Sequence, residues 1–457
     1  MDWGADRDSM ISIYKALIRS KLDYGSFIYG RATKTVLQSL ETIQNTALRL
    51  CLGAFRTTPI KRLQVEAGIE PLRLRSKRLA LQYCTKILAL PSCPLEEHIS
   101  FPEFQAKYEK RRSNAHPSLP VALKNDLDQI CPEPHRLESL DSRDTPPWQL
   151  DKVEVNLELS SQLKNEVNEQ ILRSRFGEVR DKYSGKAEIY TDGSKNGRTV
   201  AAAAVAQHDE ASVRLPDGAS IFAAELTALR LALNLAHKSK EREFVIFSDS
   251  KSSLQALGNR KKVNPLVRKI RERLGQLAAE GKAITFCWVP AHVGIVGNER
   301  ADRAAKTALA KPIGHESTKL PSDLKPDIRE LITREWQLDY DQDVQDRYKT
   351  IQPTVGLQPA THRRKIRREE IIISRIRTGH TKITHEHILK GQKETPPCTL
   401  CTTGLALTID HLILKCPALQ RERTKHFSQN AQIRDLLTED TNNLLSFLRR
   451  TKLYNKL

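Results

Sequence analysis

Between residues 184 and 312 the hydrophobic pattern alternates between two periods, and this alternation constrains the fold more than any other feature of the chain. Short apolar runs of the strand type, such as 187–191 and 244–248, are separated by longer segments with helical spacing, such as 221–237 and 264–279. Strands that alternate with helices are typical of α/β domains, in which helices cover a central sheet. The sequence therefore predicts an α/β domain at 184–312.

The rest of the chain divides into four regions of different composition. Residues 1–95 have helical spacing, whereas residues 96–183 contain the proline-rich strings HPSLP, CPEPH and TPPW and are predicted to be a connector. After the α/β domain we expect a basic helical region at 313–380 and a region with clustered cysteine and histidine at 381–457. In the first region, the predicted packing face of one helix consists of Leu37, Leu40, Ile43, Ala47 and Leu50.

An excess of basic residues indicates which partners the chain attracts. Its 74 Lys and Arg outnumber 55 Asp and Glu, which gives a formal charge of +19 and favours a polyanion such as nucleic acid. An anionic membrane is the alternative partner, but no run reaches the roughly 18 apolar residues of a spanning helix, and the N-terminus lacks an apolar signal core. We expect an intracellular protein with no membrane partner, in either the nucleus or the cytoplasm.

Four acidic residues occupy positions where a hydrophobic core would not place them. Asp192 follows the apolar strand AEIYT and Asp249 follows EFVIFS, so adjacent strands would bring these two carboxylates together. Glu225 lies in an otherwise apolar helix, and Asp302 lies in the alanine-rich segment GNERADRAAKTALA. Burying such charges costs several kcal/mol unless they are paired or bind metal.

Three of these acids also have a simpler interpretation. Asp192 could be a turn residue, Asp249 a helix N-cap and Asp302 a favourable charge near a helix N-terminus. Their occurrence together with Glu225 favours a shared site, because four neighbouring carboxylates repel one another unless cations neutralise them. Hard oxygen ligands of this kind suit Mg²⁺ or Mn²⁺.

The segments around these acids resemble the four successive motifs of type 1 ribonuclease H, in the order of that family: AEIYTDGSKNG, FAAELTALRLAL, VIFSDSKSSLQAL and WVPAHVGIVGNERADRAA. The resemblance implies a five-stranded mixed sheet with flanking helices. It also implies two metal ions bridged by Asp192, with Glu225 and Asp249 completing one site and Asp302 the other. Two such ions support in-line displacement at a phosphodiester without a protein nucleophile.

Further roles follow from the same resemblance. His292 matches the family's loop histidine, which implies proton transfer or help with product departure, although it could also be a solvated loop residue. Contacts to the RNA strand are implied for Gly193, Ser194 and Asn196, which follow Asp192 in the expected turn; the alternative for Ser194 and Asn196 is that they only form the turn. The 2′-OH is the group by which a protein distinguishes RNA from DNA.

The resemblance implies a metal-dependent endoribonuclease that cleaves the RNA strand of RNA–DNA hybrids. A catalytically silent, nucleic-acid-binding relic of a retroelement is the main alternative. A recombinase with a ribonuclease H-like fold is a third interpretation.

Near the C-terminus, the spacing C-x2-C-x9-H-x4-C is compatible with a tetrahedral zinc site. Its members are Cys398, Cys401, His411 and Cys416. Free intracellular thiols are the alternative, and His385 or His387 could replace His411 as a ligand. The basic stretch 362–377 fits either a nucleic-acid clamp or a solvated helix.

The whole arrangement resembles the C-terminal part of a non-LTR retrotransposon polyprotein of the jockey and I type. Residues 1–95 resemble the thumb that follows a polymerase palm, and ISRIRTGHTKITHEHILKG with CTLC and DHLILKC resembles the region after ribonuclease H. No polymerase turn of the Y-x-D-D kind is present, and DYDQD at 339–343 lies in a helical pattern. We therefore expect no polymerase activity, and the rest of such a polyprotein or its RNA as partners.

Overall fold

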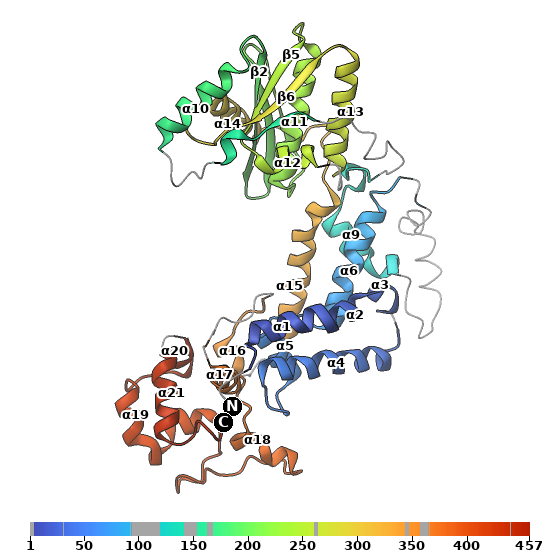
Figure 1. The fold of residues 1–457 in the computed structure, drawn as a ribbon. Helices are drawn as coiled ribbons and strands as arrows, with labels where there is room; N and C mark the ends of the chain where they lie inside the picture. Colours follow the sequence, from blue (N-terminus) through green and yellow to red (C-terminus); the bar gives the residue numbers. More distant parts are fainter. Residues whose placement is uncertain are drawn as a thin grey trace. The chain divides into compact units, whose positions relative to one another are not determined.

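The computed structural model describes residues 4–30, 32–91, 93, 119–140, 153–161, 168–259, 264–342, 347–356, 364, 366–438 and 440–457. The proline-rich residues 116–118 and 145–148 lie outside this part of the chain. Contacts divide the molecule into two units, which are described separately (Figure 1). We call Leu81–Ile328 the sheet unit, and Met1–Ala80 with Arg329–Leu457 the terminal unit.

A mixed six-stranded sheet with the order β1-β6-β5-β2-β3-β4 forms the centre of the sheet unit. Its strands are β1 (Val155–Asn156), β2 (Ala187–Asn196), β3 (Thr199–Val205), β4 (Glu210–Leu215), β5 (Glu243–Ser248) and β6 (Ala283–Trp288). Strands β2, β3 and β4 pair antiparallel, whereas β2, β5, β6 and β1 pair in parallel. The five expected strands are confirmed, and the two-residue strand β1 adds a sixth at the edge of the sheet.

Helices cover both faces of this sheet (Figure 1). One face carries α11 (Ile221–Lys238), α12 (Lys251–Gly258) and α13 (Pro265–Ala279), and the other carries α10 (Glu169–Asp181) and α14 (Val296–Ala308). The alanines of α14 let it lie close to the sheet, and Gly297 is required there because a Cβ would overlap the Tyr190 ring. Each face therefore has its own apolar core.

Helix α10 corrects the expectation that 96–183 is only a connector. Leu172, Phe176 and Val179 are buried against the same face of the sheet as α14. Their spacing of four and three residues, after the N-cap Asn168, is a helical signal that the neighbouring prolines obscured. The remaining elements of the sheet unit are α9 (Leu119–Ile130), η2 (Pro134–Arg136), η3 (Glu158–Ser161) and η4 (Pro321–Leu324).

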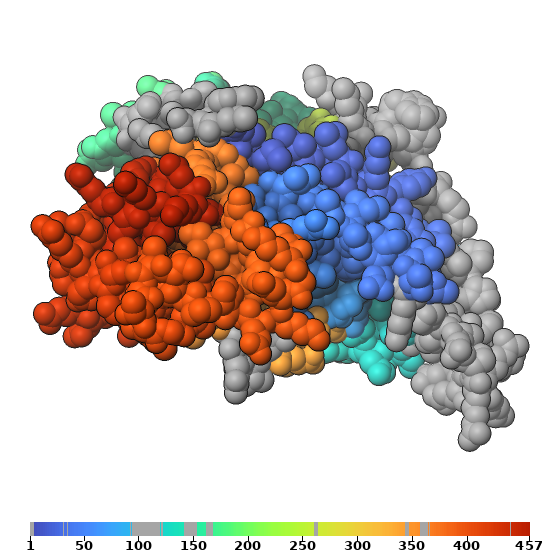
Figure 2. All heavy atoms as spheres, turned by 90° about the horizontal axis from the view of Figure 1, so that it is seen from below, coloured from blue at the N-terminus to red at the C-terminus, as the bar shows by residue number. Residues whose placement is uncertain are grey.

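Helices from both ends of the chain make up the terminal unit (Figure 2). Those from the N-terminal side are α1 (Arg7–Ile13), η1 (Tyr14–Arg19), α2 (Ser20–Asp23), α3 (Ser26–Tyr29), α4 (Lys34–Leu52), α5 (Ile60–Ala67) and the first part of α6 (Leu72–Ile87). Those from the C-terminal side are α15 (Lys325–Asp341) from Arg329 onward, α16 (Arg347–Ile351), α17 (Arg367–Thr378), α18 (Lys382–Leu389), η5 (His411–Lys415), η6 (Pro417–Leu419), α19 (Gln420–His426), α20 (Ile433–Thr438) and α21 (Thr441–Arg450). No helix in the described ranges combines the length and apolar character that crossing a bilayer requires.

The packing face expected for α4 is wrong in part. Ile43 is 48% and Leu50 67% exposed, whereas the polar Gln44 and Asn45 are buried. Gln44 accepts a hydrogen bond from the Tyr14 hydroxyl at 2.7 Å, so the interior side of the helix includes satisfied polar groups. A pattern based on apolar residues alone cannot identify such a face.

Helix α17 is neither a solvated helix nor a free basic clamp, although its sequence fits both. Its residues from Ile372 to Thr378 are mostly buried, and its arginines contact the N-terminal helices. Arg377 forms a 3.0 Å ion pair with Glu66, and the Arg375 Nε donates to the carbonyl of Gly53 at 2.8 Å. The basic side chains of this helix are used inside the terminal unit. Residues 362, 363 and 365 of the basic stretch lie outside the described chain.

Candidate active site

The register between β2 and β5 places two acids beside each other. These strands pair in parallel up to Thr191 and Ser248, so Asp192 and Asp249 occupy the next positions along the two chains. Asp249 is the first residue after β5, whereas β2 continues past Asp192 and pairs with β3. The indole Nε1 of Trp288 donates to the backbone carbonyl of Asp249 at 2.9 Å, which holds the chain at this point.

Helix α11 brings Glu225 to the same place, because its N-terminal part lies against β2. Gly193 permits this approach: a Cβ there would lie 3.0 Å from the backbone nitrogen of Glu225 and 3.1 Å from its carboxyl carbon. Ser220 caps the helix by accepting a hydrogen bond from the backbone N–H of Ala223. A glycine on the strand and a cap on the helix thus set the position of the third carboxylate.

The three acids form one group, in which Asp192 and Glu225 are buried and Asp249 is half-buried. One carboxylate oxygen from each of Asp192, Glu225 and Asp249 lies within 4.8 Å of the other two. Asp192 is 7% and Glu225 8% exposed. In the described part of the chain, the Glu225 Oε2 is buried without a hydrogen-bond partner. These residues therefore crowd negative charge into a place that water reaches poorly.

Burial and mutual repulsion change the acidity of this group. Burial, followed by the charges of Asp249 and Asp302, raises the pKa of Asp192 to about 8. Burial also raises the pKa of Glu225 well above its usual value, with Asp249 and Asp192 adding to the effect. Mg²⁺ and Mn²⁺ prefer hard oxygen ligands such as carboxylates. A cation bound here would also give the buried Glu225 oxygen a partner, so the residues present fit a divalent cation.

Asp302 lies beside this group without joining it. Its carboxylate forms a 2.7 Å ion pair with Lys306, one turn further along α14. Its charge is nevertheless close enough to raise the pKa of Asp192. Of the four acids expected to share a site, the structure brings three together and places the fourth next to them.

Asn298 is a site residue that the sequence reasoning missed. Its side chain is buried, and its Nδ2 donates to the Asp249 Oδ2 at 3.3 Å. Asn298 and Asp302 are four residues apart on α14 and so share one face of the helix. That spacing in GNERAD was the available signal, but an asparagine near a helix start is usually assigned to capping.

His292 does not contact the carboxylate group. It is exposed in the turn between β6 and α14, and its φ of 57° is unusual for a residue other than glycine. The ring is therefore open to solvent, on the segment that leads into the helix carrying Asp302.

Known proteins are similar to this part of the chain. Residues 184–310 match the model of the RNase H family. Residues 184–310 are a ribonuclease H domain. Pol polyproteins of equine infectious anemia virus are 29% identical (strain Wyoming) and 28% identical (isolates 1369 and CL22) over 139 residues, which is 29% of this chain. The chain spans only 11% of the length of these relatives.

A solved structure of the N-terminal ribonuclease H domain of a Mycobacterium tuberculosis protein, fused to maltose-binding protein, is also similar to this chain. The sequences are 26% identical, and the match covers 27% of this chain and 93% of that one, with a TM-score of 0.24.

Within the ribonuclease H domain, the residues expected in a turn after Asp192 lie in a strand instead. Gly193, Ser194 and Asn196 belong to β2, which pairs with β3 as far as Asn196 and Thr199. The turn itself contains Gly197, whose φ is 58°. Each residue of β2 from Tyr190 to Asn196 has a partner in β3.

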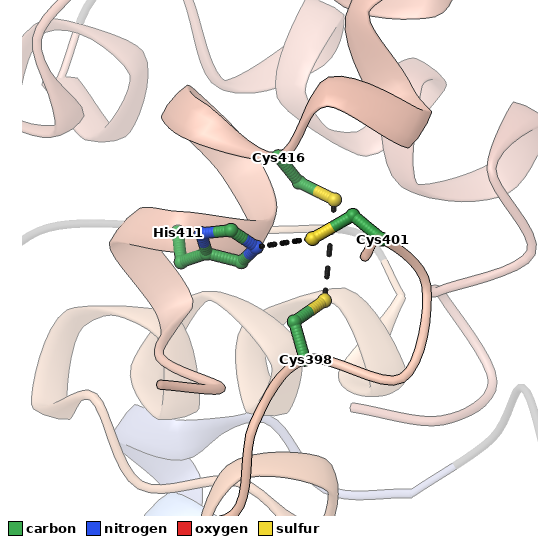
Figure 3. A group of neighbouring side chains, drawn as sticks. All are labelled: Cys398, Cys401, His411 and Cys416. Carbon is green, nitrogen blue, oxygen red and sulfur yellow. Dashed lines mark hydrogen bonds between the residues drawn. The ribbon is translucent and has the colours of Figure 1, made fainter. Parts of the chain in front are cut away.

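Outside the ribonuclease H domain, the four expected zinc ligands converge (Figure 3). One ligand atom from each of Cys398, Cys401, His411 and Cys416 lies within 4.8 Å of the others. The Cys398 and Cys416 sulfurs are 4.0 Å apart, and the Cys401 sulfur is 3.4 Å from the His411 Nε2. Zinc–sulfur bonds of about 2.3 Å at tetrahedral angles place two sulfurs about 3.8 Å apart, so the spacing fits zinc.

His411, rather than His385 or His387, accompanies the cysteines. The ring of His385 lies 3.7 Å from that of His380, and its Nδ1 shares a 2.7 Å hydrogen bond with the Thr384 hydroxyl. Helical turn η5 carries His411 and ends at Cys416, which has the extended backbone expected before Pro417.

Proposed function

We propose that the ribonuclease H domain is a metal-dependent endonuclease that cleaves the RNA strand of RNA–DNA hybrids. The observation that carries this proposal is the group formed by the buried Asp192 and Glu225 with the half-buried Asp249, in which one Glu225 oxygen has no hydrogen-bond partner in the described part of the chain. A protein keeps uncompensated carboxylates buried at a cost in stability, and such groups cluster at functional sites.

The protein residues hold the cations in position and transfer protons, and none needs to act as a nucleophile. Divalent cations held by Asp192, Glu225, Asp249 and Asp302 would supply Lewis-acid charge for the attack of water on a backbone phosphodiester. Asp192 and Glu225 hold their carboxylates in place through the strand and helix that carry them. Asn298 and Trp288 orient Asp249. His292, which is exposed, would transfer a proton when the product leaves.

Selection of RNA would depend on the residues of β2 that follow Asp192. Gly193 and Ser194 are half-buried and Asn196 is exposed, so their backbone and side chains could face the 2′-OH of a bound strand. An exposed asparagine provides both a donor and an acceptor for that hydroxyl.

Hybrid cleavage by the purified chain tests this function. A hybrid labelled on the RNA strand should be cut in Mg²⁺, whereas labelled double-stranded DNA should not. Asp192→Asn should abolish cutting, while Asp209→Asn, on an exposed aspartate of the same domain outside the acidic group, should not affect it. If the wild-type chain does not cut, the catalytically silent interpretation replaces this one.

The C-terminal cysteines and His411 form a structural zinc site in this proposal. All four protein ligands are present, and a closed set of four is typical of structural rather than catalytic zinc. The cysteines share a small apolar cluster with Leu407 and Leu412, which is too limited a core to hold the segment without a further link.

The chain would act in replication of a retroelement of the non-LTR type. Similarity to Pol polyproteins supports a retroelement context, and the net positive charge supports binding to nucleic acid. In that setting the thumb-like residues 1–95 and the zinc-binding residues 381–457 would hold template or product, with the rest of the polyprotein or its RNA as partners.

A further inference from the structure

A cavity in the sheet unit has no role in the cleavage described above. It has a volume of about 630 Å³ and lies between α10, the start of β2 and the first turns of α14. This volume falls within the range of roughly 300–1,000 Å³ that small-ligand sites occupy. Part of its wall comes from α10, which precedes the residues that match the ribonuclease H family.

The wall of this cavity is strongly basic. Four cationic side chains line it, against one carboxylate: Arg173, Arg180, Lys186 and Arg300 against Glu188. Glu188 pairs with Arg180 at 2.5 Å. From outside the lining, Glu169 lies 3.6 Å from Arg173 and Glu243 lies 3.8 Å from Lys186. Exposed pairs at such distances are weak, so the cavity still favours an anion.

The cavity adjoins the loop that contains His292 and the helix α14 that carries Asp302. Arg173 Nε donates to the carbonyl of Val293, the residue after His292. The guanidinium occupies the space beside Gly294, where a Cβ would lie 2.8 Å from its central carbon. On α14, Arg300 lines the cavity, whereas Asp302, two residues further on, lies on the opposite side of the helix. A polyanion cut at the carboxylates would reach this basic wall with a phosphate only where it extends past the start of α14.

We propose that α10 and α14 form a phosphate-binding pocket that takes a backbone phosphate of the hybrid away from the cleaved bond. Arg173 and Arg300 are its main donors, because a guanidinium matches the geometry of a phosphate and, within the described chain, neither arginine is held by a carboxylate closer than 3.6 Å. The choice of ligand rests on the proposed function, since the hybrid is the polyanion that the neighbouring site would cut.

Binding, rather than cleavage, tests the pocket. Full-length chain carrying Asp192→Asn would be titrated with a fluorescent RNA–DNA hybrid in Mg²⁺ at several salt concentrations. The double variant Arg173→Ala/Arg300→Ala should bind about threefold to tenfold more weakly. Its slope of log affinity against log salt should fall by about 0.9 for each phosphate that the protein no longer neutralises.

Arg175→Ala/Arg303→Ala is the matched control, because it removes the same charges from the same two helices outside the pocket. The single variant Arg300→Glu, at an exposed position, should also weaken binding and does not disturb the hydrogen bond between Arg173 and the loop. A hybrid too short to extend past the carboxylates should bind all variants equally.

Equal binding by pocket and control variants would overturn the pocket, because only general electrostatic attraction would then remain. The result is separable from the proposed function. Loss of binding in the pocket variants, with no cleavage by the wild-type chain, rejects the nuclease and keeps the pocket. Normal cleavage with unchanged binding rejects the pocket and keeps the nuclease.

Discussion

At the scale of single residues, burial and mutual repulsion set the acidity of Asp192 and Glu225. The raised pKa of Asp192, about 8, means that the folded protein binds a proton more tightly than the unfolded chain does. Glu225 shifts in the same direction. For such groups the stabilising contribution is complete at low pH and is lost as the pH rises towards the folded-state pKa.

Metal-free ribonuclease H domain should therefore lose stability between about pH 4 and pH 8. Thermal unfolding of the chain in a chelator, followed across this range, measures the effect. Asp192→Asn should flatten the dependence, because its amide does not titrate. If stability instead rises over this range, and does so equally in the Asp192→Asn variant, the pKa values of these carboxyl groups are not raised by folding.

Asn298 should affect metal binding, through its hydrogen bond to Asp249, rather than substrate binding. Asn298→Ala removes the side-chain amide that donates a hydrogen bond to the Asp249 Oδ2. Residues that orient a ligand typically change metal affinity or activity by about 10- to 100-fold. The Mg²⁺ concentration for half-maximal cleavage should rise accordingly, while hybrid affinity stays the same. A change confined to hybrid affinity would place Asn298 in substrate binding instead.

At the scale of elements, the alternating strands and helices could be predicted well. A sheet covered on both faces requires apolar runs in its strands and apolar residues at helical spacing in its helices, and both patterns are visible in the sequence. The acids Asp192, Glu225 and Asp249 could also be predicted to meet, since strand register and helix capping are local properties. Asn298 could not, because its role depends on the packing of α14 on the sheet. The buried faces of α4 and α17 were missed because polar side chains occupy them.

The segment around η5 should depend on zinc for its structure. Burial raises the pKa of the Cys416 thiol above its usual range, so metal binding must displace a proton there. We expect one zinc ion per chain, released more easily as the pH falls. Elemental analysis and amide exchange of Cys398–Cys416, with and without a chelator, would check this. Cys93→Ser, outside the group, is the control for Cys416→Ser. Metal-free protein with full protection in this segment would contradict a structural zinc.

At the scale of the whole molecule, the terminal unit joins segments more than 300 residues apart through a buried charge pair. Arg377 and Glu66 are 2% and 1% exposed, and the Tyr348 hydroxyl also donates to Glu66 at 2.7 Å. Although burial alone would raise the pKa of Glu66, Arg377 and Arg7 hold it below its usual value. The N-terminal helices and the C-terminal helices therefore belong to one compact unit.

Removing one partner should leave the other buried and unpaired. Arg377→Ala should lower the free energy of unfolding of the terminal unit by about 3–5 kcal/mol. Arg73→Ala, which breaks an exposed pair with Asp339, should cost less than about 1 kcal/mol. Chemical denaturation followed by amide exchange in α5 and α17 separates the two. Similar losses for both variants would mean that the buried pair does not hold the unit together.

The central claim is that Asp192, Glu225 and Asp249 form a divalent-cation site, and calorimetric titration with Mn²⁺ tests it most directly. Binding at pH 7 should release protons, seen as a heat that depends on the buffer, because Asp192 and Glu225, both with raised pKa values, must ionise to bind. Asp192→Asn should remove both the binding and the proton release, whereas Asp209→Asn should retain them. Absence of binding to the wild-type chain, or binding that Asp192→Asn leaves unchanged, would contradict the account.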